Sequence, residues 1–220
     1  MITEESNKQQ IETEIAKELL SVKAVFLSPQ SPFTWASGIL SPIYCDNRLT
    51  LSYPSVRRKI ETALAHIVQT EYPDCEVVMG TSTAGIPHAA FVAEILGLPM
   101  GYVRGDSKSH GRQNRIEGVP PVGKKVVVVE DLISTAGSSL EVVQALREIG
   151  SEVLGIVSIF TYGMQKGIDR LQAADVKNVS LTNFPTLAKV ARNEGYISEK
   201  EYAMVMKFQQ NPSDPTWREE

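Results

Sequence analysis

The sequence V-V-V-V-E-D-L-I-S-T-A-G-S, residues 126–138, is the most informative segment of this chain. Four consecutive valines predict a strand that is apolar on both faces, and such strands occupy the centre of a parallel sheet. Two carboxylates, Glu130 and Asp131, follow the valines directly. The small residues after them predict a tight turn that opens a helix. Strand, acidic pair and turn therefore form one unit at the end of a central strand.

The turn after the acidic pair has the composition of a phosphate-binding loop. Where side chains are small, backbone N–H groups can surround a phosphate, and a helix N-terminus adds a favourable dipole. Glu130 and Asp131 would repel the phosphate itself, so they suit the hydroxyls of an attached ribose or a bridging magnesium ion. An acidic N-cap after a buried strand would account for one carboxylate only. We interpret this unit as a ribose-phosphate site whose phosphate loop comprises Ser134, Thr135, Ala136, Gly137 and Ser138.

The rest of the chain alternates between strand-like and helix-like patterns. Short β-branched runs occur at residues 76–79, 126–129, 153–160 and 178–181, with a weaker run at 100–103. Helical patterns are predicted at 11–22, 54–70, 86–96 and 138–149, followed by two C-terminal helices. This alternation predicts an α/β fold with a mostly parallel central sheet and helices on both faces. Ligands of such sheets bind beyond the carboxyl ends of the strands.

Length and charge narrow the class of protein. The chain has 220 residues, a net charge of −4 and a pI near 5.5. It is long enough for one full domain, and its charge argues against a nucleic-acid partner. Cys45 and Cys75 are too few for a disulfide scaffold. The N-terminus is polar, and the apolar runs are far shorter than the ~20 residues of a membrane span. We expect a soluble cytoplasmic protein without a membrane partner.

A basic loop on this acidic chain indicates an anionic ligand. Residues 104–116 hold Arg104, Lys108, His110, Arg112 and Arg115, and little in the loop could enter a core. Glycines within and beside the loop permit hinging. The alternative is a solvated loop with ordinary surface charges.

Four segments carry a resemblance to a known family. Residues 126–138 match the phosphoribosyl diphosphate (PRPP) signature of the type I phosphoribosyltransferases. F-T-W-A-S-G-I-L-S-P-I-Y-C-D-N-R (33–48) resembles the base-recognition region of orotate phosphoribosyltransferases. G-T-S-T-A-G-I-P (80–87) resembles the diphosphate loop of that family, and Y-V-R-G-D-S-K-S-H-G (102–111) resembles its catalytic loop. The resemblance implies the type I fold as one domain over residues 1–220, with a hood at about 1–50 and a PRPP-binding core at about 51–220.

The resemblance also implies a reaction and the residues that perform it. Ribose 5-phosphate would pass from PRPP to orotate in pyrimidine biosynthesis, giving orotidine monophosphate and diphosphate. Magnesium would enter with PRPP, near Glu130 and Asp131, and a homodimer would share loop 104–116 in trans. The implied catalytic residues are Lys108, His110 and Asp131. PRPP would be bound by Arg104, Lys108, His110, Glu130, Asp131, the 134–138 loop and Thr81, Ser82 and Thr83. Orotate would be bound by Tyr44, Cys45, Arg48 and Thr135.

Some family features are missing from this chain. Lysines that many members carry are replaced by Ala36, Thr83 and Gly105, and an arginine after the strand that ends near Phe160 has no counterpart. We infer that Arg48 reads the orotate carboxylate, because a guanidinium can bind it bidentately. Arg48 could equally cap a local turn. Two alternatives stay open for the whole chain, namely transfer to another base and a non-catalytic regulator that senses PRPP.

Overall fold

The computed structural model describes residues 4–35, 38–105 and 115–218. Its main sheet has the strand order β10-β9-β8-β5-β6-β7. All neighbouring strands are parallel except β6 and β7, which are antiparallel. The mostly parallel sheet predicted from the sequence is confirmed. The strands are β5 (Val77–Thr81), β6 (Met100–Val103), β7 (Ile116–Glu117), β8 (Lys125–Ile133), β9 (Glu152–Thr161) and β10 (Asn178–Asn183).

The four valines lie in β8, between β9 and β5. All four are fully buried, and alternate valines enter separate hydrophobic clusters on the two faces of the sheet. Val128 pairs in register with Met79 of β5 and Ile156 of β9. A strand covered on both faces reads as a continuous apolar run, which explains the absence of alternation in this segment.

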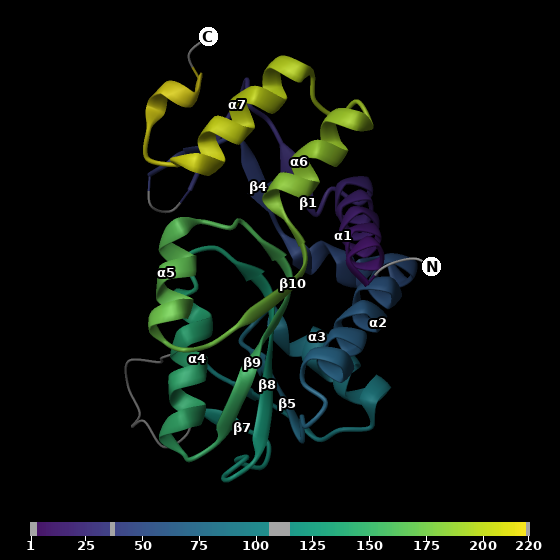
Figure 1. Cartoon of the computed structure of the whole chain (residues 1–220), viewed down its shortest axis with the longest axis vertical. Helices are drawn as coiled ribbons and strands as arrows, with labels where there is room; N and C mark the ends of the chain where they lie inside the picture. Colours follow the sequence, from purple (N-terminus) through teal and green to yellow (C-terminus); the bar gives the residue numbers. More distant parts are fainter. Residues whose placement is uncertain (1–3, 36–37, 106–114, 219–220) are drawn as a thin grey trace.

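Helices cover both faces of the sheet (Figure 1). On one side lie α2 (Pro54–Glu71) and α3 (Gly85–Leu96), with α1 (Glu4–Ser21) packed across α2, β10 and α6. The other side carries α4 (Gly137–Glu148) and α5 (Gln165–Ala173). Pro54 stands at the first turn of α2, and Gly150 follows α4 with a φ of 85°, as both residue types predict.

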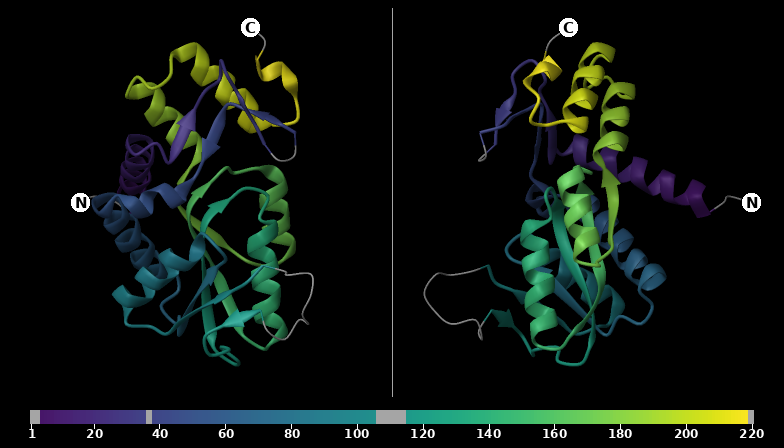
Figure 2. Two further views of the ribbon diagram at one scale, coloured as in Figure 1. Left: turned by 180° about the vertical axis from the view of Figure 1, so that it is seen from behind. Right: turned by 60° about the vertical axis from the view of Figure 1, so that its left-hand side comes forward.

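A smaller layer, the hood, lies beyond the carboxyl ends of the strands (Figures 1 and 2). Its N-terminal half has two antiparallel pairs, β1 (Val25–Leu27) with β4 (Ile43–Cys45) and β2 (Phe33–Thr34) with β3 (Leu40–Ser41). Its C-terminal half comprises α6 (Phe184–Asn193), α7 (Glu199–Gln210) and η3 (Pro215–Arg218). The 3-10 helix η1 (Asn47–Ser52) joins β4 to α2.

Aromatic side chains join the two halves of the hood. The Trp35 ring lies 5.7 Å from that of Phe208 in α7 and 5.4 Å from that of Tyr162, which follows β9. Trp217 packs against Phe208 at 5.6 Å. The C-terminal residues therefore belong to the same layer as residues 25–45.

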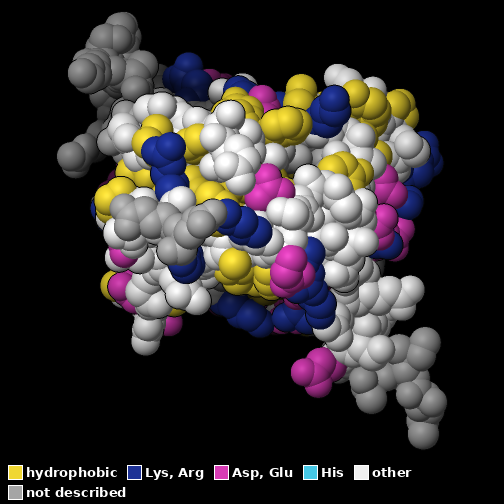
Figure 3. Space-filling model, turned by 90° about the horizontal axis from the view of Figure 1, so that it is seen from above, with side chains coloured by type: hydrophobic (Ala, Val, Ile, Leu, Met, Phe, Trp, Pro, Cys, Tyr) yellow, Lys and Arg dark blue, Asp and Glu magenta, His cyan; other side chains and the backbone are white. Residues whose placement is uncertain are grey.

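The surface of the hood end carries mixed charge. Seen from above, hydrophobic side chains gather in several patches between basic and acidic ones (Figure 3). Among the described residues, no helix has the length and apolar character needed to cross a membrane.

Candidate active site

The predicted phosphate loop lies where β8 passes into α4. Ala136 adopts a left-handed conformation, with φ 58° and ψ 14°, and α4 begins at Gly137. Ala136 stands at the N-cap and has no side-chain oxygen to accept from the first-turn amides. Those amides therefore lack an N-cap side-chain acceptor at the positive end of the helix dipole. This geometry can bind a phosphate.

Helix α5 supports this loop from outside the predicted motif. A Cβ atom on Gly167 would lie 2.5 Å from the Ser134 carbonyl oxygen, so only glycine fits this close approach. The Arg170 guanidinium donates a hydrogen bond of 3.2 Å to the carbonyl of Thr135. Sequence reasoning missed α5, and with it both of these residues. The helix is only nine residues long, and Gly167 in its first turn has a low helix propensity.

The two acidic residues have different surroundings. Glu130 is buried, and its carboxylate accepts hydrogen bonds from Thr81 Oγ1 at 2.7 Å, from Ser139 Oγ at 3.1 Å and from the Asp131 N–H at 3.0 Å. Thr81 ends β5, and Ser139 lies in the first turn of α4. Glu130 therefore ties the predicted phosphate loop to the predicted diphosphate loop.

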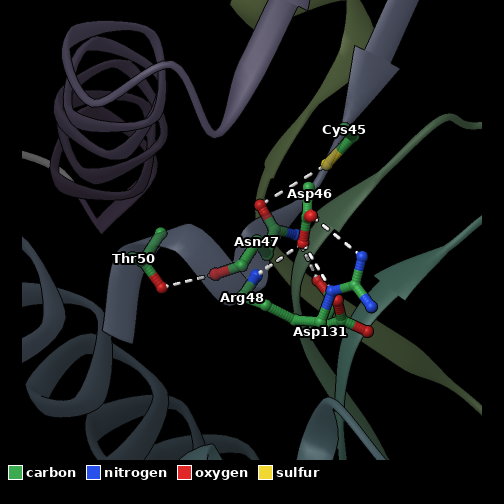
Figure 4. A network of polar contacts seen from close by, with 6 residues as sticks. All are labelled: Cys45, Asp46, Asn47, Arg48, Thr50 and Asp131. Atoms are coloured by element: carbon green, nitrogen blue, oxygen red, sulfur yellow. Dashed lines mark hydrogen bonds and ion pairs between the residues drawn. The ribbon is translucent and has the colours of Figure 1, made fainter. Parts of the chain in front are cut away.

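Asp131 is half-buried at the carboxyl end of β8. Burial, followed by the negative charge of Glu130, raises the pKa of Asp131 well above that of an ordinary aspartate. Its backbone carbonyl accepts a hydrogen bond of 2.7 Å from Asn47 Nδ2. That contact joins η1 to the carboxyl-terminal part of β8 (Figure 4). A carboxylate that desolvation makes costly to ionise is typical of a ligand-binding position.

Arg48 lies in η1 and pairs with Asp46 (Figure 4). The pair is bidentate, with Nε to Oδ1 at 2.6 Å and a terminal nitrogen to Oδ2 at 2.8 Å. Asp46 also caps the N-terminus of η1 by accepting from the Arg48 N–H at 3.2 Å. The two Arg48 donors that we expected to bind the orotate carboxylate, Nε and a terminal nitrogen, are thus bonded to Asp46.

The predicted diphosphate loop follows β5. Thr81 is buried, whereas Ser82 and Thr83 lead into α3. Ser82 Oγ accepts a hydrogen bond of 2.8 Å from the Gly105 N–H, so this loop contacts the beginning of the basic loop.

Both ends of the basic loop meet beside β6 and β7. The Arg104 N–H donates to the Arg115 carbonyl at 2.7 Å, and the Arg104 side chain pairs with Glu117 at 3.2 Å. Lys108 and His110, the predicted catalytic residues of this loop, lie outside the described residues, as does Ala36.

A cavity of about 680 Å³ lies between the hood and the end of the sheet. It brings together Tyr44, Cys45 and Thr135, three of the residues predicted to bind orotate; Arg48 is not in its wall. Ser134 also lines it, so the cavity borders the phosphate loop directly. Burial, followed by the charges of Asp131 and Asp46, raises the pKa of the Cys45 thiol, which favours the neutral group.

Sequence reasoning missed much of the cavity wall. Tyr162 and Met164 come from the segment between β9 and α5, and Lys166 comes from the first turn of α5. Residues 209–213 come from the end of α7 and the chain after it. Gln209 Nε2 donates to the Gly163 carbonyl at 3.4 Å across this junction. The polar segment Q-Q-N-P-S (209–213) gave no signal in the sequence, because only folding brings it to the cavity.

The described residues contain no cluster of three or more His, Cys, Asp or Glu side chains that could hold a metal ion. A closed cage made of protein ligands is therefore not found in that part of the chain. The half-buried carboxylate of Asp131 beside an anion loop fits a magnesium ion that keeps substrate phosphates among its ligands.

Comparison with known proteins identifies the family. Residues 51–190 match the model of the phosphoribosyl transferase domain. Orotate phosphoribosyltransferase of Listeria innocua is 54% identical, over 92% of this chain and 97% of that protein. The same enzyme of Halalkalibacterium halodurans is 52% identical, over 94% and 98%. The crystal structure of orotate phosphoribosyltransferase from Aeropyrum pernix covers 84% of this chain and 99% of its own, at 30% identity and a TM-score of 0.73. With this identity over nearly the full length of its relatives, the chain belongs to the orotate phosphoribosyltransferases.

Proposed function

We propose that this chain transfers ribose 5-phosphate from PRPP to orotate, giving orotidine monophosphate and diphosphate for pyrimidine biosynthesis. One observation carries the proposal beyond family membership. Ser134 and Thr135 belong both to the phosphate loop and to the wall of the cavity. A phosphate on the loop and a base in the cavity would therefore adjoin, as the two ends of a nucleoside monophosphate do.

The reaction forms a bond from an orotate ring nitrogen to the anomeric carbon of the ribose, and that nitrogen gives up its proton, which balances the proton taken up by the diphosphate. The bond from that carbon to the diphosphate oxygen breaks, and the electron pair leaves with diphosphate. Positive charge develops on the ribose while this happens. Asp131, which directly precedes the cavity-lining residue Leu132, would face that charge and bind the ribose hydroxyls. The phosphate loop would hold the substrate in position, which lowers the entropic part of the barrier.

The departing diphosphate needs positive charge and hydrogen-bond donors. Thr81, Ser82 and Thr83 would donate to it from the loop after β5, and Arg104, Lys108 and His110 would add charge from the basic loop. His110 or Lys108 would deliver a proton to the leaving oxygen. A magnesium ion bound through PRPP would neutralise part of the diphosphate charge.

The proposal includes a homodimer in which loop 104–116 serves the site of the neighbouring subunit. The loop leaves and rejoins the body beside β6 and β7, at the edge of the sheet where a neighbour could approach. It also includes a cytoplasmic location, which agrees with the free thiols of Cys45 and Cys75.

The test is the ultraviolet absorbance change of orotate with PRPP, magnesium and the purified protein, repeated with excess chelator. Adenine, guanine, hypoxanthine and uracil replace orotate in parallel assays. We expect magnesium-dependent consumption of orotate alone. Consumption of a purine instead would overturn the choice of base. No reaction with any base, in a protein that still binds PRPP, would favour a regulator.

A further inference from the structure

The cavity between hood and sheet contains one charged side chain among its described lining residues, that of Lys166. The other lining residues are apolar, aromatic or neutral polar, with Tyr44, Thr135 and Tyr162 among them. Orotate carries a carboxylate on its pyrimidine ring. Moving a carboxylate out of water is unfavourable unless a partner compensates its charge. A base pocket for orotate therefore needs a cation, and the cavity wall offers Lys166.

The position of Lys166 places it beside the phosphate loop. It stands in the first turn of α5, next to Gly167, where an added Cβ would lie 2.5 Å from the Ser134 carbonyl oxygen. The same cavity is lined by Met164, Tyr162 and Cys45. The lysine thus lies in the base cavity yet close to the point where ribose would join the base.

The Lys166 side chain is available for a ligand. It is exposed, and within the described part of the chain its ammonium group has no ion-pair partner. Its neighbour Gln165 is engaged with Asp169 at 2.7 Å. Arg48, the cation that the sequence favoured, is paired bidentately with Asp46 and does not line the cavity. Using Arg48 would first require breaking that pair.

We propose that Lys166 is a specificity-determining residue that binds the orotate carboxylate and thereby selects orotate over uncharged pyrimidines. This inference rests on the proposed function and names a determinant of its base specificity. A flexible ammonium group on a four-carbon stem can follow the carboxylate into the cavity as the base settles. The phosphate loop already has amide donors and a helix dipole, so the ribose phosphate does not depend on this lysine.

The test compares the wild-type protein with Lys166→Gln and Lys166→Arg, using Lys189→Gln as the matched control. Lys189 is an exposed lysine of α6 that does not line the cavity. Each protein is assayed for the KM of orotate and, separately, the KM of PRPP. The inhibition constant of uracil, which is orotate without the carboxylate, is measured in the same assay.

For Lys166→Gln we expect the KM of orotate to rise at least about tenfold, as for a lost charge-assisted hydrogen bond. The inhibition constant of uracil and the KM of PRPP should stay within about twofold. Lys166→Arg should recover part of the orotate affinity, and Lys189→Gln should behave as wild type.

Three results would overturn the inference while leaving the proposed function intact. They are an unchanged orotate KM in Lys166→Gln, a rise confined to the KM of PRPP, and an equal loss of uracil and orotate binding. The second result would mean that Lys166 binds a phosphate of PRPP. The third would mean that Lys166 maintains the shape of the cavity without recognising the carboxylate. A wild-type protein that does not turn over orotate would instead refute the proposed function itself.

Discussion

The Thr81 hydroxyl at the end of β5 donates a hydrogen bond of 2.7 Å to the carboxylate of Glu130 in β8, 49 residues further along the sequence. Ser139 and the Asp131 amide donate to the same carboxylate. Glu130 is therefore a buried acceptor that fixes the two anion loops relative to each other. We assign it a positioning role, with Asp131 as the carboxylate that faces the substrate.

Replacing Glu130 with Gln should disturb this arrangement. A neutral amide offers one acceptor oxygen where the carboxylate has two, and its NH2 group would face donors, so a destabilisation of about 1–3 kcal/mol is expected. The pKa of Asp131 should fall, because the Glu130 charge is one of the causes that raise it. Chemical denaturation and the pH profile of kcat/KM would measure both effects. Glu148→Gln, on the exposed side of α4, is the control. A stable variant with an unshifted profile would refute the positioning role.

Replacing Asp131 with Asn should lower turnover while stabilising the protein at alkaline pH. Loss of the carboxylate removes charge stabilisation from the transition state, which is worth on the order of a hundredfold in kcat. The folded-state pKa of Asp131 is raised, so its ionisation reduces stability as the pH rises from the unfolded value through the folded value. At a pH above the folded-state pKa, Asp131→Asn should therefore have a larger free energy of unfolding than wild type. Near pH 4 the two proteins should have the same free energy of unfolding. A wild-type kcat would remove Asp131 from the site.

Gly167→Ala should impair the phosphate loop. The added Cβ would lie 2.5 Å from the Ser134 carbonyl oxygen, so α5 or the loop must move. Overpacking of this kind costs about 1–3 kcal/mol, partly offset by the better helix propensity of alanine. The KM of PRPP should rise several-fold. Ile168→Ala, at the exposed neighbouring position, serves as the control. Equal PRPP kinetics in both variants would show that the contact does not matter.

His88 should make the free energy of unfolding decrease as the pH falls into the acidic range. It is fully buried in α3, its ring nitrogens have no hydrogen-bond partner in the described part of the chain, and burial lowers its pKa to about 4. The unfolded chain binds the proton near pH 6.5, so stability is full above that pH and falls as the pH drops towards 4. The loss amounts to roughly 3 kcal/mol.

His88→Leu should flatten this pH dependence, which urea unfolding between pH 7 and pH 4 would measure. His66→Gln, at an exposed position of α2, should leave the slope unchanged. Parallel curves for wild type and His88→Leu would rule out His88 as the titrating group.

Lys108→Ala should lower kcat by orders of magnitude and leave orotate binding intact, because the lysine is assigned to the departing diphosphate. Single-turnover assays and equilibrium binding of orotate would separate the two. Lys124→Ala, which removes a surface ion pair with Glu76, is the control. Unchanged turnover in Lys108→Ala would refute the catalytic role of the loop.

The sheet was predictable because its strands are marked in the sequence by runs of β-branched residues. The valines of β8 and the β-branched runs of β5 and β9 lie where the sequence placed them, and the structure extends β8 to Ile133 and β10 to Asn183. The antiparallel strand β7 and the helix α5 were not predicted. β7 has two residues, too few to show a period, and α5 is a short helix of nine residues with Gly167 in its first turn.

The site was predictable only where it is local. Residues 130–138 form one continuous segment, and the sequence grouped them correctly around the β8–α4 junction. The ion pair of Arg48 with Asp46 was not predictable, because sequence spacing does not show whether Arg48 binds a neighbouring carboxylate or a ligand. The contributions of Lys166 and residues 209–213 depend on how the hood folds over the sheet.

The most direct measurement offers orotate, uracil, adenine, guanine and hypoxanthine together, at equal concentration, to the wild-type protein with limiting PRPP and magnesium. Chromatography then identifies the nucleotide formed, and diphosphate is measured in the same sample. We predict orotidine monophosphate as the sole nucleotide, in a 1:1 ratio to diphosphate. A different nucleotide, or release of diphosphate without any nucleotide, would refute the transfer of ribose 5-phosphate to orotate.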